Sequence, residues 1–369
     1  MPVFETLRQL VERNEKLFPD ETCLIYEERR LTFREFAERT RRLASALHGL
    51  GMRHQDRVAM LAMNCPEYLD VYGVGEVAGF IVAPINFRLA PPETAYIIRD
   101  ASPRVLIFES QYAEVIETLR DQLPSVQHYI CIGDTTPAWA LAYETVLASG
   151  SPEGPPLRPT ADDILMILYT SGTTGRPKGV MTTHEQNIWL AEMQAFENSS
   201  DLGDKFLLMM PFYHLGGRSQ SLGHYFRAGT VIMQRKFDPL DVVRTIERER
   251  VTQVHLAPTM LQEVLDLPDI DRYDLSSLKS LQHAAAPMSV TLLKRAVKKF
   301  GPILIDGFGQ TEGGGTTLRR HHHKVDEDVR NVKRLASVGQ PQLHTQMKIV
   351  DDNDNEVPVG SIGEICFKS

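Results

Sequence analysis

At 369 residues the chain is too long for one ordinary hydrophobic core, and 42% apolar with 24% charged residues is typical of a soluble globular protein. The net charge of −8 argues against a general nucleic-acid-binding surface. The longest apolar run, residues 68–80, is interrupted by Asp70, Glu76 and glycines, so no run reaches the roughly 20 residues of a membrane span. The N-terminus lacks a signal-peptide pattern and the four cysteines are widely spaced, so we expect free thiols in a cytoplasmic protein.

The first part of the chain alternates helix and strand signals. Thr32 and Glu35 form a capping-box pattern, which predicts an amphipathic helix that ends near Gly49. Strands are expected at 57–62, 81–83 and 105–108, and a helix over 66–80 lies between the first two. Strands separated by helices of this size predict a parallel, doubly wound sheet.

Two changes in amino-acid composition divide the rest of the chain. Residues 149–162 are rich in proline and glycine, which predicts a linker, and a second alternating region follows to about 335. After that, short β-branched runs such as 348–350 and 362–367 predict antiparallel strands. We therefore expect an α/β fold with two doubly wound subdomains, 1–155 and 156–335, and a partial small β-barrel-like subdomain over 336–369.

The most informative stretch is 169–180, which reads Tyr-Thr-Ser-Gly-Thr-Thr-Gly-Arg-Pro-Lys-Gly-Val. It follows an apolar run, 164–168, that predicts a buried strand. A strand that opens into this loop suits phosphate, because glycines let backbone N–H groups turn inward, hydroxyls add donors and Lys178 adds a charge. A Walker A loop is excluded, since Lys178 is followed by Gly179 and not by serine or threonine.

This string closely resembles the signature loop of the adenylate-forming superfamily, which contains acyl-CoA synthetases, luciferases and the adenylation domains of peptide synthetases. The resemblance implies that the loop holds the β- and γ-phosphates of ATP, and that Thr170 also helps to hold Mg²⁺. The implied nucleotide-binding residues here are Thr170, Ser171, Gly172, Thr173, Thr174, Gly175 and Lys178. Four further segments match the superfamily in the expected order, so the resemblance covers nearly the whole chain.

The second matching segment is 211–217, Pro-Phe-Tyr-His-Leu-Gly-Gly. The resemblance implies that His214 lies between the acyl pocket and the nucleotide, and that the pocket is lined in part by Gly216, Gly217 and Arg218. The third segment, 283–287, is similar to a strand and turn that lie against adenine, which implies contacts from Ala284, Ala285, Ala286 and Pro287. His283 stands where a small residue is usual, so we expect it to reshape the acyl pocket.

The fourth segment, 306–312, is similar to the superfamily's Gly-Tyr-Gly-x-Thr-Glu motif. The resemblance implies that Phe308 stacks on adenine, Asp306 accepts from the adenine amino group and Thr311 approaches the α-phosphate. It also implies that Glu312 holds Mg²⁺, a hard cation that prefers oxygen ligands. Gly307, Gly309 and Gln310 complete the nucleotide contacts, and Gly309 and Gln310 border the acyl pocket. The catalytic residues implied are Lys178, His214, Thr311 and Glu312.

Two other segments are expected to carry no chemistry. Residues 360–367 resemble the fifth motif of the superfamily, which we interpret as structural. The triplet His321–His323 is flanked by Arg319, Arg320 and Lys324, which repel cations, and adjacent strand side chains alternate in direction. We therefore expect a solvated loop there and no metal site.

The resemblance implies an ATP-dependent ligase that converts a carboxylic acid, fatty or aromatic, to an acyl-adenylate and then to a coenzyme A thioester, with Mg²⁺. Polar groups around the expected pocket favour an aromatic or functionalised acid over acetate. The superfamily's ribose-binding aspartate, catalytic lysine and C-terminal lid would lie after residue 369. We therefore expect a longer natural protein, and little or no activity from this chain alone.

Several alternatives remain open. An acyl-AMP ligase that loads a carrier protein shares all of these motifs, luciferase-type oxygenation is a minor option, and a non-catalytic nucleotide-binding module belongs to another class. An amino-acid adenylation domain is disfavoured, because residues 213–218 contain no acid and Arg218 would repel an ammonium group. The expected partners are the acid, ATP and coenzyme A, without nucleic acid or a membrane span, and a homodimer is left open.

Overall fold

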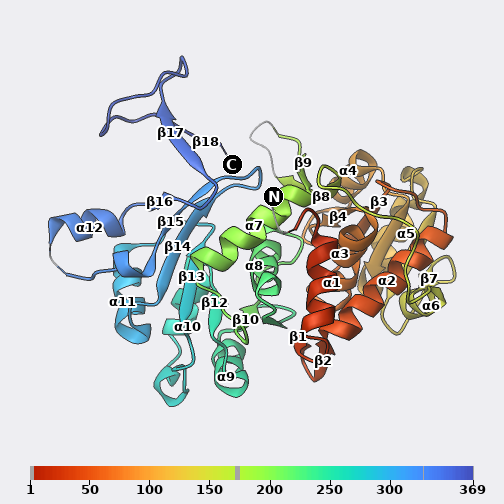
Figure 1. Ribbon diagram of the computed structural model, residues 1–369, viewed down its shortest axis with the longest axis horizontal. Helices are drawn as coiled ribbons and strands as arrows, with labels where there is room; N and C mark the ends of the chain where they lie inside the picture. Colours follow the sequence, from red (N-terminus) through yellow and green to blue (C-terminus); the bar gives the residue numbers. More distant parts are fainter. Residues whose placement is uncertain (1–3, 171–174, 327, 369) are drawn as a thin grey trace. The chain divides into compact units, whose positions relative to one another are not determined.

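The computed structural model describes residues 4–170, 175–326 and 328–368 (Figure 1). The chain divides into two compact units. Unit 1 comprises Met1–Glu192 and Leu208–Lys236, and unit 2 comprises Met193–Leu207 and Phe237–Ser369. The chain therefore leaves unit 1, returns to it and leaves again.

Unit 1 is built on a sheet whose described strands run in the order β7-β6-β5-β3-β4-β8-β9. All neighbours pair in parallel except β9, which pairs antiparallel with β8. Consecutive residues of β3 from Val58 to Leu61 are all buried, so both faces of the sheet are covered. The strands are β3 (Arg57–Leu61), β4 (Ile81–Ile85), β5 (Val105–Glu109), β6 (His128–Ile132), β7 (Leu141–Ala142), β8 (Ile164–Thr170) and β9 (Lys178–Thr183), which confirms the strands predicted near 57, 81, 105 and 164.

The helices of unit 1 begin where the sequence signals them. The predicted capping box is present: Thr32 N–H donates to Glu35 Oε2 at 2.8 Å, and Glu35 N–H donates to Thr32 Oγ1 at 3.2 Å. Helices α4 and α5 pack on one sheet face against Leu61, Ile85 and Phe108, and α1, α2 and α3 pack against one another (Figure 1). The helices are α1 (Leu7–Leu17), α2 (Phe33–Gly49), α3 (Glu67–Ala78), α4 (Pro91–Ala101), α5 (Ala113–Leu119), α6 (Tyr143–Ser149), α7 (His184–Glu197), whose last residues belong to unit 2, and α8 (Leu215–Phe226).

The second segment of unit 1, residues 208–236, packs against the start of the chain. Strand β11 (Thr230–Met233) pairs in parallel with β1 (Thr22–Tyr26), and β1 pairs antiparallel with β2 (Arg29–Thr32). These strands join residues about 200 positions apart in sequence. The sequence patterns did not predict this pairing, since it depends on long-range contacts.

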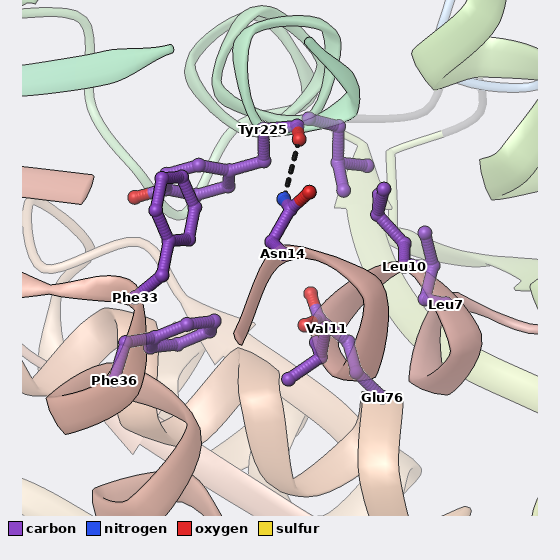
Figure 2. Close-up of a pocket in the computed structure, with 9 residues that line it drawn as sticks. Leu7, Leu10, Val11, Asn14, Phe33, Phe36, Glu76 and Tyr225 are labelled. Carbon is purple, nitrogen blue, oxygen red and sulfur yellow. Dashed lines mark hydrogen bonds between the residues drawn. The ribbon is translucent and has the colours of Figure 1, made fainter. Parts of the chain in front are cut away.

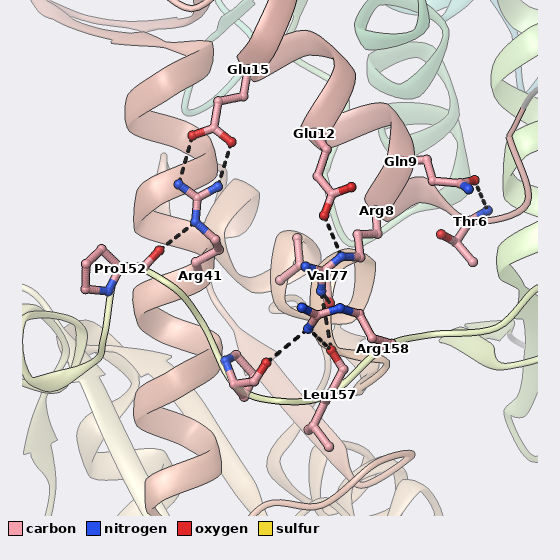
Figure 3. Close-up of polar contacts among 11 residues, drawn as sticks. Thr6, Arg8, Gln9, Glu12, Glu15, Arg41, Val77, Pro152, Leu157 and Arg158 are labelled. Carbon is pink, nitrogen blue, oxygen red and sulfur yellow. Dashed lines mark hydrogen bonds and ion pairs between the residues drawn. The ribbon is translucent and has the colours of Figure 1, made fainter.

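The proline-rich segment around residue 155 lies inside unit 1 and does not separate it from unit 2. Figure 3 shows how side chains hold it: Arg41 donates to the Pro152 carbonyl at 2.6 Å and to both oxygens of Glu15 at 2.6 and 2.8 Å. Arg8 of α1 donates to the carbonyls of Val77 at 2.7 Å and Leu157 at 3.3 Å. The expected subdomain boundary at 155/156 therefore does not coincide with the border between the units, because β8, which follows it, pairs with β4.

Unit 2 carries a parallel sheet with an antiparallel extension. Strands β10, β12, β13 and β14 pair in parallel in that order, and β15 and β16 extend the edge beyond β14 with antiparallel pairing. These strands are β10 (Lys205–Leu208), β12 (Gln253–His255), β13 (Ser280–Ala284), β14 (Leu304–Gly309), β15 (Gly315–Leu318) and β16 (Gln340–Pro341), with helices α9 (Pro239–Glu249), α10 (Pro258–Leu265), α11 (Val290–Phe300) and α12 (Val329–Leu335). Strands β17 (Gln346–Val350) and β18 (Glu364–Lys368) form the predicted antiparallel pair near the C-terminus. The α/β fold class with parallel sheets is confirmed.

Two features concern the whole described chain, namely its cysteines and the apolar character of its helices. Cys23, Cys65, Cys131 and Cys366 are all free thiols. Among the described residues, no helix combines the length and the apolar character that crossing a bilayer requires.

Candidate active site

The predicted phosphate loop connects β8 and β9, which pair antiparallel as a hairpin. Thr170 and Lys178 are paired where the two strands meet the loop, and we call this pair the neck of the hairpin. Ser171, Gly172, Thr173 and Thr174 lie outside the described residues. Gly175 has φ +96°, a left-handed conformation that favours glycine. The ammonium-bearing side chain of Lys178 is exposed. The hairpin therefore presents Lys178 to solvent at the point where the loop begins and ends.

Helix α4 anchors both sides of this neck. The Tyr169 hydroxyl donates to Asp100 Oδ2 at 2.6 Å, and the Tyr96 hydroxyl donates to the Pro177 carbonyl at 3.2 Å. Gly179 lies opposite Tyr169, and a Cβ there would approach Ile167 Cγ2 within 2.6 Å. The anchors and the glycine fix the loop ends on a rigid element, as a phosphate site requires.

His214 forms the N-cap of α8. Its Nδ1 accepts a hydrogen bond from the Gly216 N–H at 3.2 Å. Desolvation lowers the pKa of His214, so near pH 7 the ring is neutral and its proton is on Nε2. The side chain is still exposed. His214 therefore offers one N–H donor in a fixed orientation.

Residues that the sequence analysis missed hold the segment before His214 in place. The Asn64 side chain, which is buried, donates to the carbonyls of Met210 at 3.0 Å and Gln234 at 3.1 Å, and accepts from the Phe212 N–H at 2.8 Å. The Tyr72 hydroxyl donates to the Phe212 carbonyl at 2.7 Å. The available signal was a polar residue three positions after the end of β3, because side chains after the carboxyl ends of parallel strands face the ligand-binding edge.

Arg218 is predicted to line the acyl pocket, and that role stays a prediction. Its side chain is buried, forms an ion pair with Glu76 of α3, and lies over the Tyr72 ring at 4.3 Å. Glu76 borders a small, mostly apolar cavity between α1, α2 and α8, across which Asn14 donates to the Tyr225 carbonyl at 2.7 Å (Figure 2). Because Glu76 compensates Arg218, the predicted repulsion of an ammonium substrate by Arg218 loses its basis.

The two glycines after His214 are also at the start of α8. A Cβ on Gly217 would lie 2.8 Å from the Pro211 carbonyl oxygen, so this position requires glycine. Gly216 supplies the N–H that His214 accepts. Their predicted place in an acyl pocket stays a prediction.

In unit 2, the two predicted adenine segments are neighbouring strands. His283 is paired with Asp306 and Ala284 with Gly307 across β13 and β14. After β13 the exposed turn Ala285–Pro287 leads into α11, and Ala285 has φ +72°. A left-handed alanine costs about 1–2 kcal/mol, and strain of this kind clusters at functional sites.

Phe308 and Asp306 share one face of β14, since they are two residues apart. Phe308 is 40% exposed, and the Phe367 ring of β18 lies 6.4 Å away. Burial raises the pKa of Asp306 to about 6. An exposed ring beside a perturbed carboxylate is typical of a binding site for a flat polar ligand.

This pKa shift has a consequence for stability. Well below pH 3.8 the carboxyl is protonated in both folded and unfolded chains, whereas above pH 6 the folded state must bury a charge that the unfolded state solvates freely. We expect Asp306→Asn to raise the free energy of unfolding by up to about 3 kcal/mol at pH 8 and to change it little at pH 4. Urea unfolding at both pH values measures this, and an equal effect at the two would contradict the cause given.

Thr311 and Glu312 lie in the turn between β14 and β15, which also contains Gln310. Gly309 pairs with Gly315 at the base of this turn, and Gly313 and Gly314 have φ of +113° and +72°. Glu312 is exposed, and its carboxylate oxygens are the ligand type that Mg²⁺ prefers. Within the described residues no group of three or more histidine, cysteine, aspartate or glutamate side chains is placed to hold a metal. A Mg²⁺ ion held by one or two protein oxygens and by phosphates fits these residues.

The expectation of a solvated histidine triplet is wrong for His323. Its side chain is 3% exposed, and its Nδ1 lies 3.2 Å from the Arg319 carbonyl oxygen. The bond is local because residues 320–322 form a 3₁₀ turn, which folds His323 back onto the chain. The His323 ring packs edge-to-face against His283, with centroids 6.4 Å apart.

A parallel sheet with a hydroxyl- and glycine-rich hairpin, and a second with an aromatic–carboxylate face, are typical of a nucleotide-binding α/β enzyme. The chain belongs to the AMP-binding enzyme family, whose model matches residues 11–369. It is 32% identical over 358 residues to a feruloyl-CoA synthase of an Amycolatopsis species, covering 96% of this chain and 68% of that protein.

The chain is also similar to a carrier-protein ligase and to a solved N-terminal domain. The chain is 27% identical over 370 residues to the fatty acid–[acyl-carrier-protein] ligase ScoC of Streptomyces coeruleorubidus, covering 99% of this chain and 69% of that protein. The inhibitor-bound N-terminal domain of FACL13 from Mycobacterium tuberculosis has a TM-score of 0.89 at 27% identity, covering 99% of this chain and 89% of that one. The predicted resemblance to the adenylate-forming superfamily is confirmed, and these relatives support a ligase that activates acids with ATP.

Proposed function

We propose that the protein joins a carboxylic acid, fatty or aromatic, to coenzyme A in two steps. The carboxylate oxygen attacks the α-phosphorus of ATP, and the α–β phosphoanhydride bond breaks to release pyrophosphate. The thiol sulfur of coenzyme A then attacks the acyl carbon, and AMP leaves. The first step activates the acid, since a carboxylate is a poor electrophile and its adenylate is a good one.

The observation that carries the proposal is the family match over 11–369, since it includes both the hairpin with Lys178 and the β13–β14 edge. Catalysis of such a transfer consists mainly of positioning and charge neutralisation. In the proposal Lys178 and the loop hydroxyls bind the leaving pyrophosphate, Asp306 and Phe308 bind adenine, and Thr311 contacts the α-phosphate. His214 donates from Nε2 at the boundary of the acyl site. Glu312 would help to hold Mg²⁺, which would neutralise phosphate charge when bound.

The test is acid-dependent exchange of labelled pyrophosphate into ATP by the full-length protein, with a panel of acetate, straight-chain fatty acids, aromatic acids and amino acids. The proposal expects exchange with fatty or aromatic acids and none without added acid. ATP binding without exchange for any acid would favour a non-catalytic nucleotide-binding module. Exchange with amino acids alone would favour an amino-acid adenylation domain.

Transfer to a carrier protein is the second candidate, and the similarity to a fatty acid–[acyl-carrier-protein] ligase favours it. Both candidates share the adenylation step, so exchange cannot separate them. Offering the pre-formed adenylate to coenzyme A and, separately, to a phosphopantetheinylated carrier protein does so. Thioester formation with coenzyme A at the higher kcat/KM supports the proposed function.

Replacing Glu312 tests the proposed metal ligand. Glu312→Gln keeps the size of the side chain and removes its charge, so we expect a higher Mg²⁺ concentration for half-maximal exchange. Because the residue is exposed in a turn, folding should be unaffected. Glu364→Gln, at another exposed carboxylate of unit 2, is the matched control. A Glu312→Gln titration that overlays the wild type would remove Glu312 from the site.

A further inference from the structure

His283, Asp306 and Phe308 form a row on one face of the unit 2 sheet. His283 and Asp306 are paired across β13 and β14, and Phe308 follows two residues later on the same face. His283 is 1% exposed, the Asp306 side chain is 22% exposed, and Phe308 is 40% exposed. The row therefore runs from the buried core to the surface.

The protonation of His283 follows from its surroundings. Burial, and secondarily the neighbouring His323 and His255, lower the pKa of His283 to about 3, so the ring is neutral near pH 7. A neutral imidazole carries one N–H. Among the described residues neither ring nitrogen of His283 has a well-aligned hydrogen-bond partner, yet Nδ1 lies 3.3 Å from Asp306 Oδ1. Asp306 is thus the acceptor that the fold places within reach of Nδ1.

His323 does not compete for this carboxylate. A carbonyl oxygen only accepts, so the contact of His323 Nδ1 with the Arg319 carbonyl at 3.2 Å requires the His323 proton to be on Nδ1. In its neutral form His323 therefore has no proton on Nε2 to donate. The neutral His323 ring is therefore not a donor for Asp306.

We propose that His283 is a positioning residue: its Nδ1–H donates to Asp306 Oδ1 and leaves Oδ2 facing the amino group of a purine stacked on Phe308. The inference rests on the proposed function, which makes Asp306 the acceptor for adenine. The 3.3 Å separation is slightly long, and the two groups are not aligned as a hydrogen bond in this structure. Hydrogen bonds in unliganded sites are often long or poorly aligned and tighten when ligand binds.

Orientation of the carboxylate matters because adenine and guanine differ at this edge. Adenine presents an amino donor where guanine presents a carbonyl acceptor. A carboxylate oxygen fixed at this edge attracts the amino group of adenine and repels the carbonyl oxygen of guanine. A freely rotating carboxylate discriminates less between the two bases. His283 therefore sets the preference for ATP over GTP.

The test measures equilibrium binding of ATP and GTP to the full chain by calorimetry. His283→Leu fills a similar volume without a donor, and His283→Asn places an amide N–H near the position of Nδ1. We expect His283→Leu to lower the ratio of ATP to GTP affinity about tenfold, the value of one hydrogen bond to a charged group, and His283→Asn to keep it. Equal losses in both variants, or an unchanged ratio in His283→Leu, would overturn the inference. A His283→Leu variant with a changed acid preference and an unchanged ratio of ATP to GTP affinity would also overturn it. That result would instead make His283 part of the acyl pocket.

Asp306→Asn separates this inference from the proposed function. The Asp306→Asn variant should lose the preference for ATP over GTP. An unchanged ratio of ATP to GTP affinity would show that Asp306 does not contact the purine base. A loss in Asp306→Asn without a loss in His283→Leu would overturn only the role of His283. If His283→Leu does not fold, ¹⁵N NMR of the wild-type imidazoles decides: the inference expects the Nδ1–H tautomer at pH 7, and an Nε2–H tautomer would contradict it.

Discussion

Replacing Lys178 by alanine is expected to slow acid-dependent ATP–pyrophosphate exchange by roughly 10²–10³-fold, as for the loss of one preorganised donor to transition-state charge. Lys178 lies at the neck of a hairpin whose two sides are anchored on α4 by Tyr169 and Tyr96. Its exposed side chain has no folding role in the described structure. The loss should therefore appear in kcat and not in stability.

Lys16→Ala is the matched control, because Lys16 is another exposed lysine of unit 1, on α1. Both variants should unfold at the wild-type urea midpoint, and Lys16→Ala should exchange pyrophosphate at the wild-type rate. Near wild-type exchange in a folded Lys178→Ala chain would show that the hairpin does not contact the leaving group.

Replacing Glu76 by leucine is expected to lower the free energy of unfolding by about 3–5 kcal/mol, because it leaves the buried charge of Arg218 without its partner. Both side chains are almost fully buried, and Arg218 also lies over the Tyr72 ring. The double variant Glu76→Leu/Arg218→Met removes both charges and should recover most of the loss. Urea unfolding of the two single variants, the double variant and the wild type completes the cycle.

The exposed pair Arg34–Asp20 provides the comparison for this cycle. Its side chains are 58% and 86% exposed, so Asp20→Ala should cost no more than about 1 kcal/mol. If Glu76→Leu costs as little as Asp20→Ala, the pair with Arg218 does not hold α8 on α3. A double variant as unstable as the single one would also contradict this account.

The elements that could be predicted are those with local signals. The capping box at Thr32 and the apolar runs at 57, 81, 105 and 164 specify their helix and strands through neighbouring residues alone, and the structure confirms them. The matched motifs likewise located the hairpin neck and the β14–β15 turn. These features depend on spacing along a short stretch of chain.

The features that were missed depend on contacts between distant residues. Glu76 was read only as an interruption of an apolar run, although a charge inside an apolar helix requires a buried partner, here Arg218. The segment around residue 155 has the composition of a linker, but Arg41 and Arg8 bind its carbonyls and make it part of unit 1. Neither partner can be identified from local composition.

The most direct test of the central claim follows an oxygen atom. The full-length protein is given ATP, coenzyme A and an accepted acid labelled with ¹⁸O in both carboxylate oxygens, and the masses of the products are measured by mass spectrometry. Attack on the α-phosphorus transfers one acid oxygen to the nucleotide, so the account predicts one ¹⁸O in each AMP released. Label in inorganic phosphate with ADP as the nucleotide product, or AMP without label, would contradict it.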